Sequence, residues 1–174
     1  MKESTERRIN MFEVYVLVPV RKSVLGMFVG LLSLVLGVFS FVLSCISRLF
    51  TIPMLVFGGI GYYMTFCSGK EYEYAYFDGD IRIAKVMNKS RRKQLEEYSM
   101  GDVLCVAPAG DRSVRRYEGD STVKVKSYTS KDKSKPYYEM VVAKEGTTTL
   151  VKFEPDEKFL DAMMVKYAQK VVKG

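Results

Sequence analysis

Two long uncharged runs dominate the pattern of hydrophobic and polar positions along the chain. Residues 23–47 and 49–69 carry no charged side chain, and Arg48 alone separates them. A helix of about 20 apolar residues crosses the hydrocarbon core of a bilayer, and a helix that is apolar on every face is typical of membrane spans. We therefore predict a transmembrane hairpin over residues 23–69, with helices at about 24–46 and 50–68. Thr51 is predicted to cap the second helix, with Pro53 in its first turn.

Small residues recur along both predicted spans at spacings that place them on one face of each helix. In lipid, helices associate mainly through close approach at such residues, so we interpret these faces as helix-packing surfaces. The same residues could instead support dimerisation. The packing residues are Gly26, Gly30, Ser33, Gly37, Ser40 and Ser44 in the first span, and Gly58 and Gly61 in the second.

The distribution of basic residues predicts the orientation of the hairpin. Basic residues precede the first span and follow the second, whereas the connecting loop offers only Arg48. The positive-inside rule therefore places both termini in the cytoplasm, in a multi-pass protein of the cell membrane. A cleaved signal peptide fits poorly because the first run is too long for its apolar region. A lipoprotein cleavage box at 42–45 is also a poor fit, since Leu43 is unfavourable and the leader contains three glutamates.

Beyond the spans the pattern changes from apolar runs to the alternation of β-strands. Short alternating segments fill residues 70–154, separated by turn sequences such as Asp78-Gly79 and Glu145-Gly146. Pro155 and two acidic residues then open an amphipathic helix. The predicted fold class is a membrane helical hairpin plus a small β-rich α+β domain of about seven antiparallel strands and a C-terminal helix. Residues 1–22 are predicted as a cytoplasmic leader and residues 70–174 as a cytoplasmic domain. A β-prone segment at 11–20 either adds a strand to that domain or lies at the membrane interface.

Charge and composition exclude several classes of function. The net charge of +7 is spread over a leader, a loop and a domain without any recognised nucleic-acid-binding module. The chain has no histidine, which removes the commonest general base and metal ligand. Its three cysteines are predicted to be reduced. We expect no enzymatic activity, no cofactor, no metal site and no nucleic-acid partner. Asp78 and Asp80 are interpreted as turn residues, because a calcium loop needs more oxygen ligands.

The chain resembles a known family in several stretches. These are Tyr76 to Ile81, Lys85 to Lys89, Arg91 to Lys93, Val106 to Pro108 and Phe153 to Pro155, together with the preceding hairpin. They are similar to an uncharacterised family of small two-span membrane proteins of Gram-positive bacteria, a domain of unknown function. The order of strands and helix also resembles bacterial pleckstrin-homology-like (PH-like) domains, a barrel with one end closed by a C-terminal helix. This resemblance implies no catalytic activity.

Two basic clusters are the candidate contacts for lipid or phosphate. Their charges would attract the anionic cytoplasmic leaflet, although exposed charges also protect strand edges from pairing. We predict a non-catalytic, membrane-anchored interaction module that binds a protein partner or anionic lipid head groups. The alternative is an accessory subunit of a larger membrane complex that assembles through the hairpin. The candidate residues are Lys89, Arg91, Arg92 and Lys93 in the first cluster, and Arg112, Arg115 and Arg116 in the second.

Overall fold

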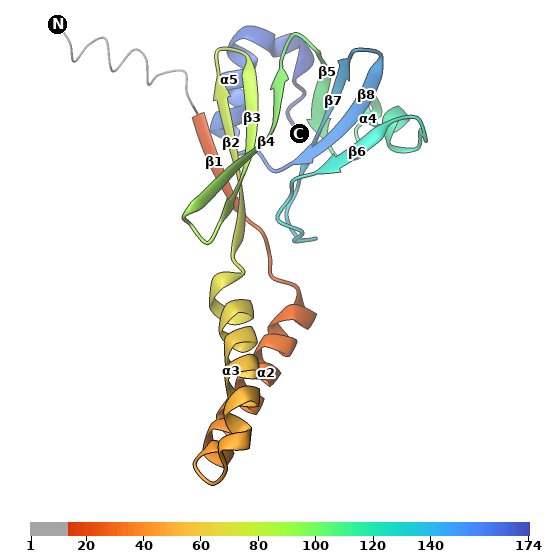
Figure 1. Ribbon diagram of the computed structural model, residues 1–174. Helices are drawn as coiled ribbons and strands as arrows, with labels where there is room; N and C mark the ends of the chain where they lie inside the picture. The colour runs from red at the N-terminus through yellow and green to blue at the C-terminus, as the bar shows by residue number, and fades with distance from the viewer. Residues whose placement is uncertain (1–13) are drawn as a thin grey trace, which may run out of the picture. The chain divides into compact units, whose positions relative to one another are not determined.

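The computed structural model describes residues 14–174, which form two compact units (Figure 1). The β unit contains residues 14–20, 71–86 and 92–174, and the hairpin unit contains residues 21–70 and 87–91. Residues 1–13, including the start of the predicted leader and of the predicted strand at 11–20, lie outside the described residues.

The hairpin unit consists of two antiparallel helical segments joined by a short link. Helix α2 spans Val24–Ser44, and a 3-10 turn, η1 (Arg48–Phe50), leads directly into α3 (Thr51–Tyr62). A π-helical segment, η2 (Tyr63–Cys67), continues α3. The predicted cap at Thr51 is wrong: Phe50 occupies the cap position because η1 runs into α3 without a break. Pro53 lies in the first turn of α3, as predicted.

The first sheet of the β unit holds four strands in the order β1-β2-β3-β4 (Figure 1). They are β1 (Val14–Pro19), β2 (Lys70–Phe77), β3 (Asp80–Met87) and β4 (Arg91–Ser99). Strand β1 pairs antiparallel with β2, from Val14 opposite Tyr76 to Pro19 opposite Glu71. The β-prone segment before the helices is therefore an edge strand, and Pro19 stands at its last position, where a missing N–H is tolerated.

The second sheet has the order β5-β7-β8-β6. Its strands are β5 (Val103–Pro108), β6 (Lys124–Ser127), β7 (Tyr138–Lys144) and β8 (Thr147–Phe153). The hairpin of β7 and β8 turns at Glu145 and Gly146, as predicted, and both residues have the positive φ that is typical of a primed two-residue turn. Helix α4 (Arg112–Glu118) follows β5, and α5 (Glu157–Tyr167) closes the described fold with a 3-10 turn, η3 (Ala168–Lys170).

The predicted seven-stranded antiparallel barrel is wrong in two respects. The described strands number eight and form two separate sheets, and β6 pairs with β8 in parallel rather than antiparallel fashion. The barrel does not close because the C-terminal segment occupies the edge of β5: Val171 bridges to Val106, and the Val172 N–H donates to the Val106 carbonyl at 2.8 Å. That edge is therefore engaged in its own pairing rather than in a ladder with β4.

One hydrophobic core joins both sheets and α5. Tyr74 and Ile81 come from the first sheet, Phe153 from the second, and Phe159 and Met163 from α5, and all are fully buried. The rings of Tyr74, Phe153 and Phe159 meet edge to face with centroids 5.8–6.4 Å apart, the arrangement that aromatic quadrupoles favour. The predicted C-terminal helix is thus confirmed, and its apolar face packs into the core that both sheets share.

Candidate functional site

Small residues bring α2 and α3 into close contact. Added Cβ atoms would lie 2.8 Å from the Leu34 N at Gly61, and 3.0 Å from the Gly58 N at Gly37. At Gly30, the nearest atom would be the Thr65 Oγ1, at 3.0 Å. At Gly61 a Cβ atom would force the helices to shift, and at Gly37 and Gly30 it would make an unusually tight contact, so the glycines allow the close approach of the two helices.

Most of the predicted packing residues lie at this interface, but not all of them do. Ser33 and Ser40 are buried there beside Gly30 and Gly37. Gly26 packs loosely, since its added Cβ would meet nothing closer than 3.8 Å. The Ser44 hydroxyl donates to the Phe41 carbonyl of its own helix at 2.6 Å.

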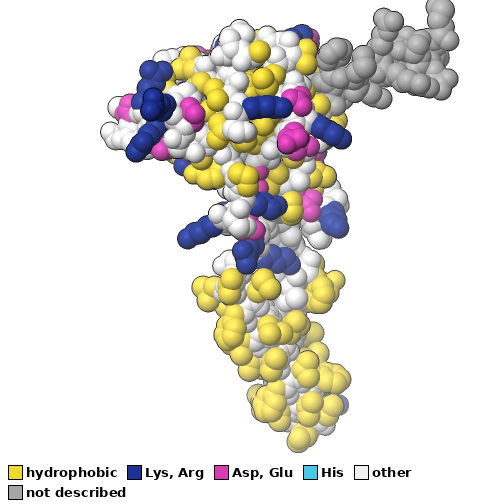
Figure 2. All heavy atoms as spheres, turned by 180° about the vertical axis from the view of Figure 1, so that it is seen from behind, with side chains coloured by type: hydrophobic (Ala, Val, Ile, Leu, Met, Phe, Trp, Pro, Cys, Tyr) yellow, Lys and Arg dark blue, Asp and Glu magenta, His cyan; other side chains and the backbone are white. Residues whose placement is uncertain are grey.

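The outer surfaces of α2 and α3 are apolar and uncovered. Figure 2 shows hydrophobic side chains over the hairpin, and Phe28, Val38 and Ile52 are each more than half exposed. Two helical segments, Val24–Ser44 and Arg48–Cys67, are long and apolar enough to cross a membrane. Only 22% of the apolar window of the first and 6% of the second is buried, whereas a core helix of a soluble protein is mostly buried.

Polar contacts organise the open end of the hairpin, where the chain enters α2 and leaves η2. The Lys22 Nζ donates to the Thr65 carbonyl at 2.6 Å, which satisfies a backbone group inside the π-helical segment. The Asn88 N–H donates to the Gly69 carbonyl at 2.9 Å, so the turn between β3 and β4 is fixed to the end of the hairpin. The sequence pattern did not indicate either contact, because each joins residues far apart in the chain.

The first basic cluster divides between two environments. Lys89 lies in the β3–β4 turn and Arg91 at the start of β4, both exposed and both within the hairpin unit. Arg92 and Lys93 belong to the β unit. A guanidinium nitrogen of Arg92 pairs with the Glu73 carboxylate of β2 at 2.5 Å, so the charge of Arg92 is already compensated.

The second basic cluster lies on the short helix α4 of the β unit. Arg112, Arg115 and Arg116 are exposed on α4, whose cap is the Asp111 carboxylate accepting from the Ser113 N–H at 2.8 Å. Arg116 stacks on the Tyr117 ring, 4.6 Å from its centroid, and donates to the Tyr117 hydroxyl. The first cluster thus lies in the β3–β4 turn and the start of β4, and the second lies on α4.

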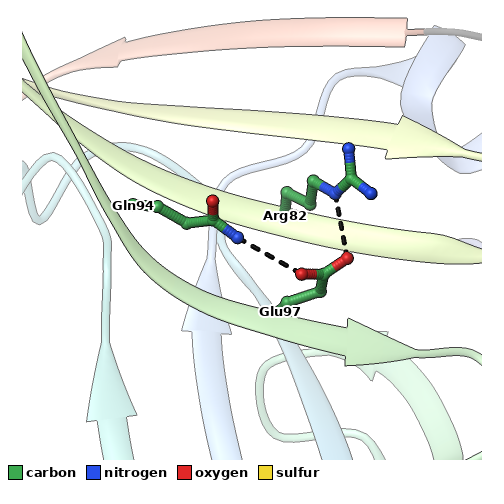
Figure 3. Close-up of polar contacts among 3 residues, drawn as sticks. All are labelled: Arg82, Gln94 and Glu97. Carbon is green, nitrogen blue, oxygen red and sulfur yellow. Dashed lines mark hydrogen bonds and ion pairs between the residues drawn. The ribbon is translucent and has the colours of Figure 1, made fainter.

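Other surface charges of the first sheet form ordinary cross-strand contacts. In Figure 3, Arg82 of β3 points toward Glu97 of β4, whose second oxygen accepts from Gln94. The Arg82–Glu97 distance is 2.9 Å, and both side chains are about half exposed. Such exposed pairs contribute about 0–1 kcal/mol, so this contact adds little to the stability of the sheet.

The second sheet contains a buried ion pair that was not predicted from the sequence. Glu139 of β7 is fully buried, and its Oε1 lies 3.0 Å from the Lys152 Nζ of the neighbouring strand β8. Neither carboxylate oxygen receives a well-aligned hydrogen bond within the described residues. Desolvation therefore raises the pKa of Glu139 above its ordinary value, against the opposing effect of Lys152, and Glu118 of α4 raises it further. The sequence signal for this pair was a charged residue, Glu139, within the apolar strand predicted at 137–144.

The described residues offer little for acid–base or metal chemistry. Burial raises the pKa of the Cys105 thiol, which makes it a poor nucleophile at neutral pH. Burial also raises the pKa of Tyr76 to about 12, so that its hydroxyl stays protonated. The three cysteines are free, and residues 14–174 contain no group of three or more acidic, cysteine or histidine side chains that could hold a metal ion.

The comparisons with known proteins identify the family. A family described as a bacterial PH-like domain (DUF6106), whose function is unknown, matches residues 12–173. No curated protein and no solved structure matches the chain. The predicted resemblance to PH-like domains is confirmed, while its two-span and Gram-positive parts stay predictions. Because the match covers almost the whole chain, from before β1 to the C-terminal segment, the chain belongs to the bacterial PH-like domain family DUF6106.

Proposed function

We propose that the protein is a non-catalytic interaction module anchored in the cell membrane by α2 and α3. The observation that carries this proposal is the uncovered apolar surface of the hairpin. At 1.5 Å per residue, the 21 residues of α2 extend about 31 Å, which matches the ~30 Å hydrocarbon core of a bilayer. Close packing at Gly37 and Gly61 needs no partner to hold the two helices together.

The charge distribution supports an orientation with both termini in the cytoplasm. The hairpin unit carries six basic residues and no acidic residue, and only Arg48 lies at its closed end. Basic residues beside membrane spans are retained on the cytoplasmic side. The β unit then faces the cytoplasm, a reducing compartment that suits its one cysteine, the free Cys105.

A PH-like domain suggests binding rather than catalysis. The partner in this proposal is a protein or the anionic head groups of the leaflet. Anchoring changes the binding energetics, because a tethered domain meets membrane-bound partners at a high effective concentration, and a weak contact then suffices.

Two measurements on cells test the proposal. After alkaline carbonate extraction, the full chain should float with the membrane fraction. In a cysteine-free background, an impermeant thiol reagent should label Leu49→Cys, at the hairpin link, in intact cells. It should label Lys133→Cys, in the β unit, only after permeabilisation. Release of the chain by carbonate would overturn the anchor, and the reverse labelling pattern would overturn the orientation.

A second function, an accessory subunit of a membrane complex, is favoured by an outward-facing glycine. An added Cβ atom at the exposed Gly59 would meet nothing within 4 Å among the described residues. Such a surface permits close approach of another membrane helix. Under this alternative, Gly59→Leu should abolish co-purification of a partner in neutral detergent. Under the anchored-module proposal it should have no effect. Gly30→Leu and Gly37→Leu cannot separate the two, because both disrupt the hairpin itself.

A further inference from the structure

Helix α4 covers one face of the second sheet through a small apolar cluster of its own. Val114 of α4 is fully buried there. Its cluster, which is separate from the main core, includes one residue from each of three strands: Ala107 of β5, Val141 of β7 and Leu150 of β8. The adjacent residues Met140 and Val151 belong to the main core. Because neighbouring residues of a strand point to opposite faces, α4 covers the face that is turned away from the main core.

Glu139 lies on the face that α4 covers. It is two residues from Val141 along β7, and it stands opposite Ala107 of β5 and Lys152 of β8. Its side chain is fully buried, with the Oε1 3.0 Å from the Lys152 Nζ. Neither carboxylate oxygen receives a well-aligned hydrogen bond within residues 14–174. A carboxylate in such a position is costly, whereas the neutral carboxylic acid costs far less.

The groups that surround Glu139 come from three elements. Desolvation is the main cause of its raised pKa; Lys152 of β8 opposes this shift, and Glu118 at the C-terminal end of α4 adds to it. The Lys152 Nζ also lies over the Tyr137 ring, 5.4 Å from its centroid. Strand β5 supplies the thiol of Cys105, whose pKa burial raises, and no charged residue. The three arginines of α4 are exposed. An ionised Glu139 is therefore opposed by burial and by a second carboxylate on α4 itself.

Glycines flank α4 at both ends. Gly119 follows the helix directly, and Gly110, with φ +83°, precedes it by two residues. An added Cβ atom at either glycine would meet nothing within 4 Å among the described residues. The Glu118 carboxylate accepts from the Gly110 N–H at 3.3 Å, which links the two ends of the segment to each other. A short helix between two unrestricted glycines can move as a unit, because glycine absorbs large changes of φ and ψ.

We propose that α4 is a pH-dependent cover, which stays docked on the second sheet while the Glu139 carboxyl group carries a proton and opens when that proton is lost. Opening lets water reach the new carboxylate and separates it from Glu118. Because the pKa of Glu139 is raised in the docked state, docking is strongest below the ordinary pKa of a glutamate. It weakens as pH rises through the raised pKa. The inference concerns the β unit, so it holds whether or not the hairpin spans a membrane.

Hydrogen–deuterium exchange of the full chain in detergent, at acidic, neutral and mildly alkaline pH, tests this cover. Each measured rate is divided by the intrinsic rate at the same pH, because chemical exchange itself accelerates with pH. Protection of the α4 amides should fall as pH rises, by up to about tenfold per pH unit, since opening releases one proton. The amides of β7 and β8 report unfolding of the whole β unit, and they should stay more strongly protected than those of α4 at every pH.

Three variants identify the group that titrates. Glu139→Gln should make the protection of α4 independent of pH. Glu118→Gln, at an exposed position, should leave a smaller fall, because Glu139 holds its proton less strongly without this neighbour. The matched control is Glu97→Gln, the same change in the exposed pair with Arg82, which should keep the wild-type profile.

Three results would overturn the inference. The first is a wild-type α4 whose protection does not change with pH. The second is a single protection profile shared by α4, β7 and β8, which would show that α4 opens only when the whole β unit unfolds. The third is a full wild-type fall in either Glu139→Gln or Glu118→Gln.

Discussion

The register of β1 on β2 shows where a short turn could replace the hairpin, and it predicts how stable the β unit is without the hairpin. Pro19 pairs with Glu71, so residues 20 and 70 stand opposite each other at the end of the ladder. A two-residue Asn-Gly turn closes such an antiparallel pair. A bridged chain of residues 12–20, Asn-Gly and residues 70–174 should therefore fold as a soluble domain. Residues 70–174 alone lack β1 and should be much less stable.

The magnitude follows from the side chains that β1 contributes to the core. Val18 is 5% exposed, and Val14 and Val16 are partly buried against the same core. Full burial of a valine is worth about 2 kcal/mol and half burial about 1 kcal/mol, which gives ~4 kcal/mol. The ladder hydrogen bonds, at ~1 kcal/mol each, roughly offset the cost of ordering the strand backbone. A loss of ~4 kcal/mol removes most of the stability of a small domain.

Urea denaturation followed by circular dichroism measures this difference directly. Two substitutions in the bridged chain provide matched controls on opposite faces of β1. Val18→Asp should be strongly destabilising, because it places a charge in the core. Leu17→Asp should have little effect, because Leu17 is 59% exposed. The reasoning is refuted if residues 70–174 unfold within ~1 kcal/mol of the bridged chain.

Four further predictions concern single positions. The pKa of Glu139 is raised in the folded state, so between its unfolded and folded pKa the folded chain keeps a proton that the unfolded chain releases. The free energy of unfolding therefore falls as pH rises through this range. In urea denaturation at acidic and neutral pH, the free energy of unfolding of Glu139→Gln should depend less on pH than that of the wild type. An unchanged pH dependence would contradict the raised pKa of Glu139. Lys152→Met should cost about 3 kcal/mol at neutral pH in the same assay, because it leaves a buried carboxylate without a cation, and a neutral effect would argue against the pair. Gly61→Leu should separate the two helices, since its side chain would meet the Leu34 backbone, and disulfide cross-linking between engineered cysteines on α2 and α3 should fall; full cross-linking would show that the packing differs. Lys89→Gly should raise the stability of the bridged chain by about 0.5–1 kcal/mol in urea, because glycine suits the positive φ, and destabilisation would contradict the turn assignment.

Several features of the fold could be read from local sequence because they depend on local chemistry. Charge-free runs and the spacing of their small residues predicted two helices and the faces that pack. The turn at Glu145-Gly146 was predictable because a primed turn needs residues that tolerate positive φ. The C-terminal helix followed from its apolar face and acidic first turn. Each of these signals is contained within one continuous stretch of sequence.

The tertiary structure decided what depends on residues far apart in the chain. Strand β1 joins β2 across the whole hairpin, and the C-terminal segment takes the edge of β5 and leaves the barrel open. The pair of Glu139 and Lys152 forms because two strands are in register, and burial then shifts its titration. The turn at Asn88 likewise meets the end of the hairpin through a hydrogen bond between residues far apart in the chain, from the Asn88 N–H to the Gly69 carbonyl. Pairing, burial and clustered charge are properties of distances in space, so the order of residues alone could not determine them.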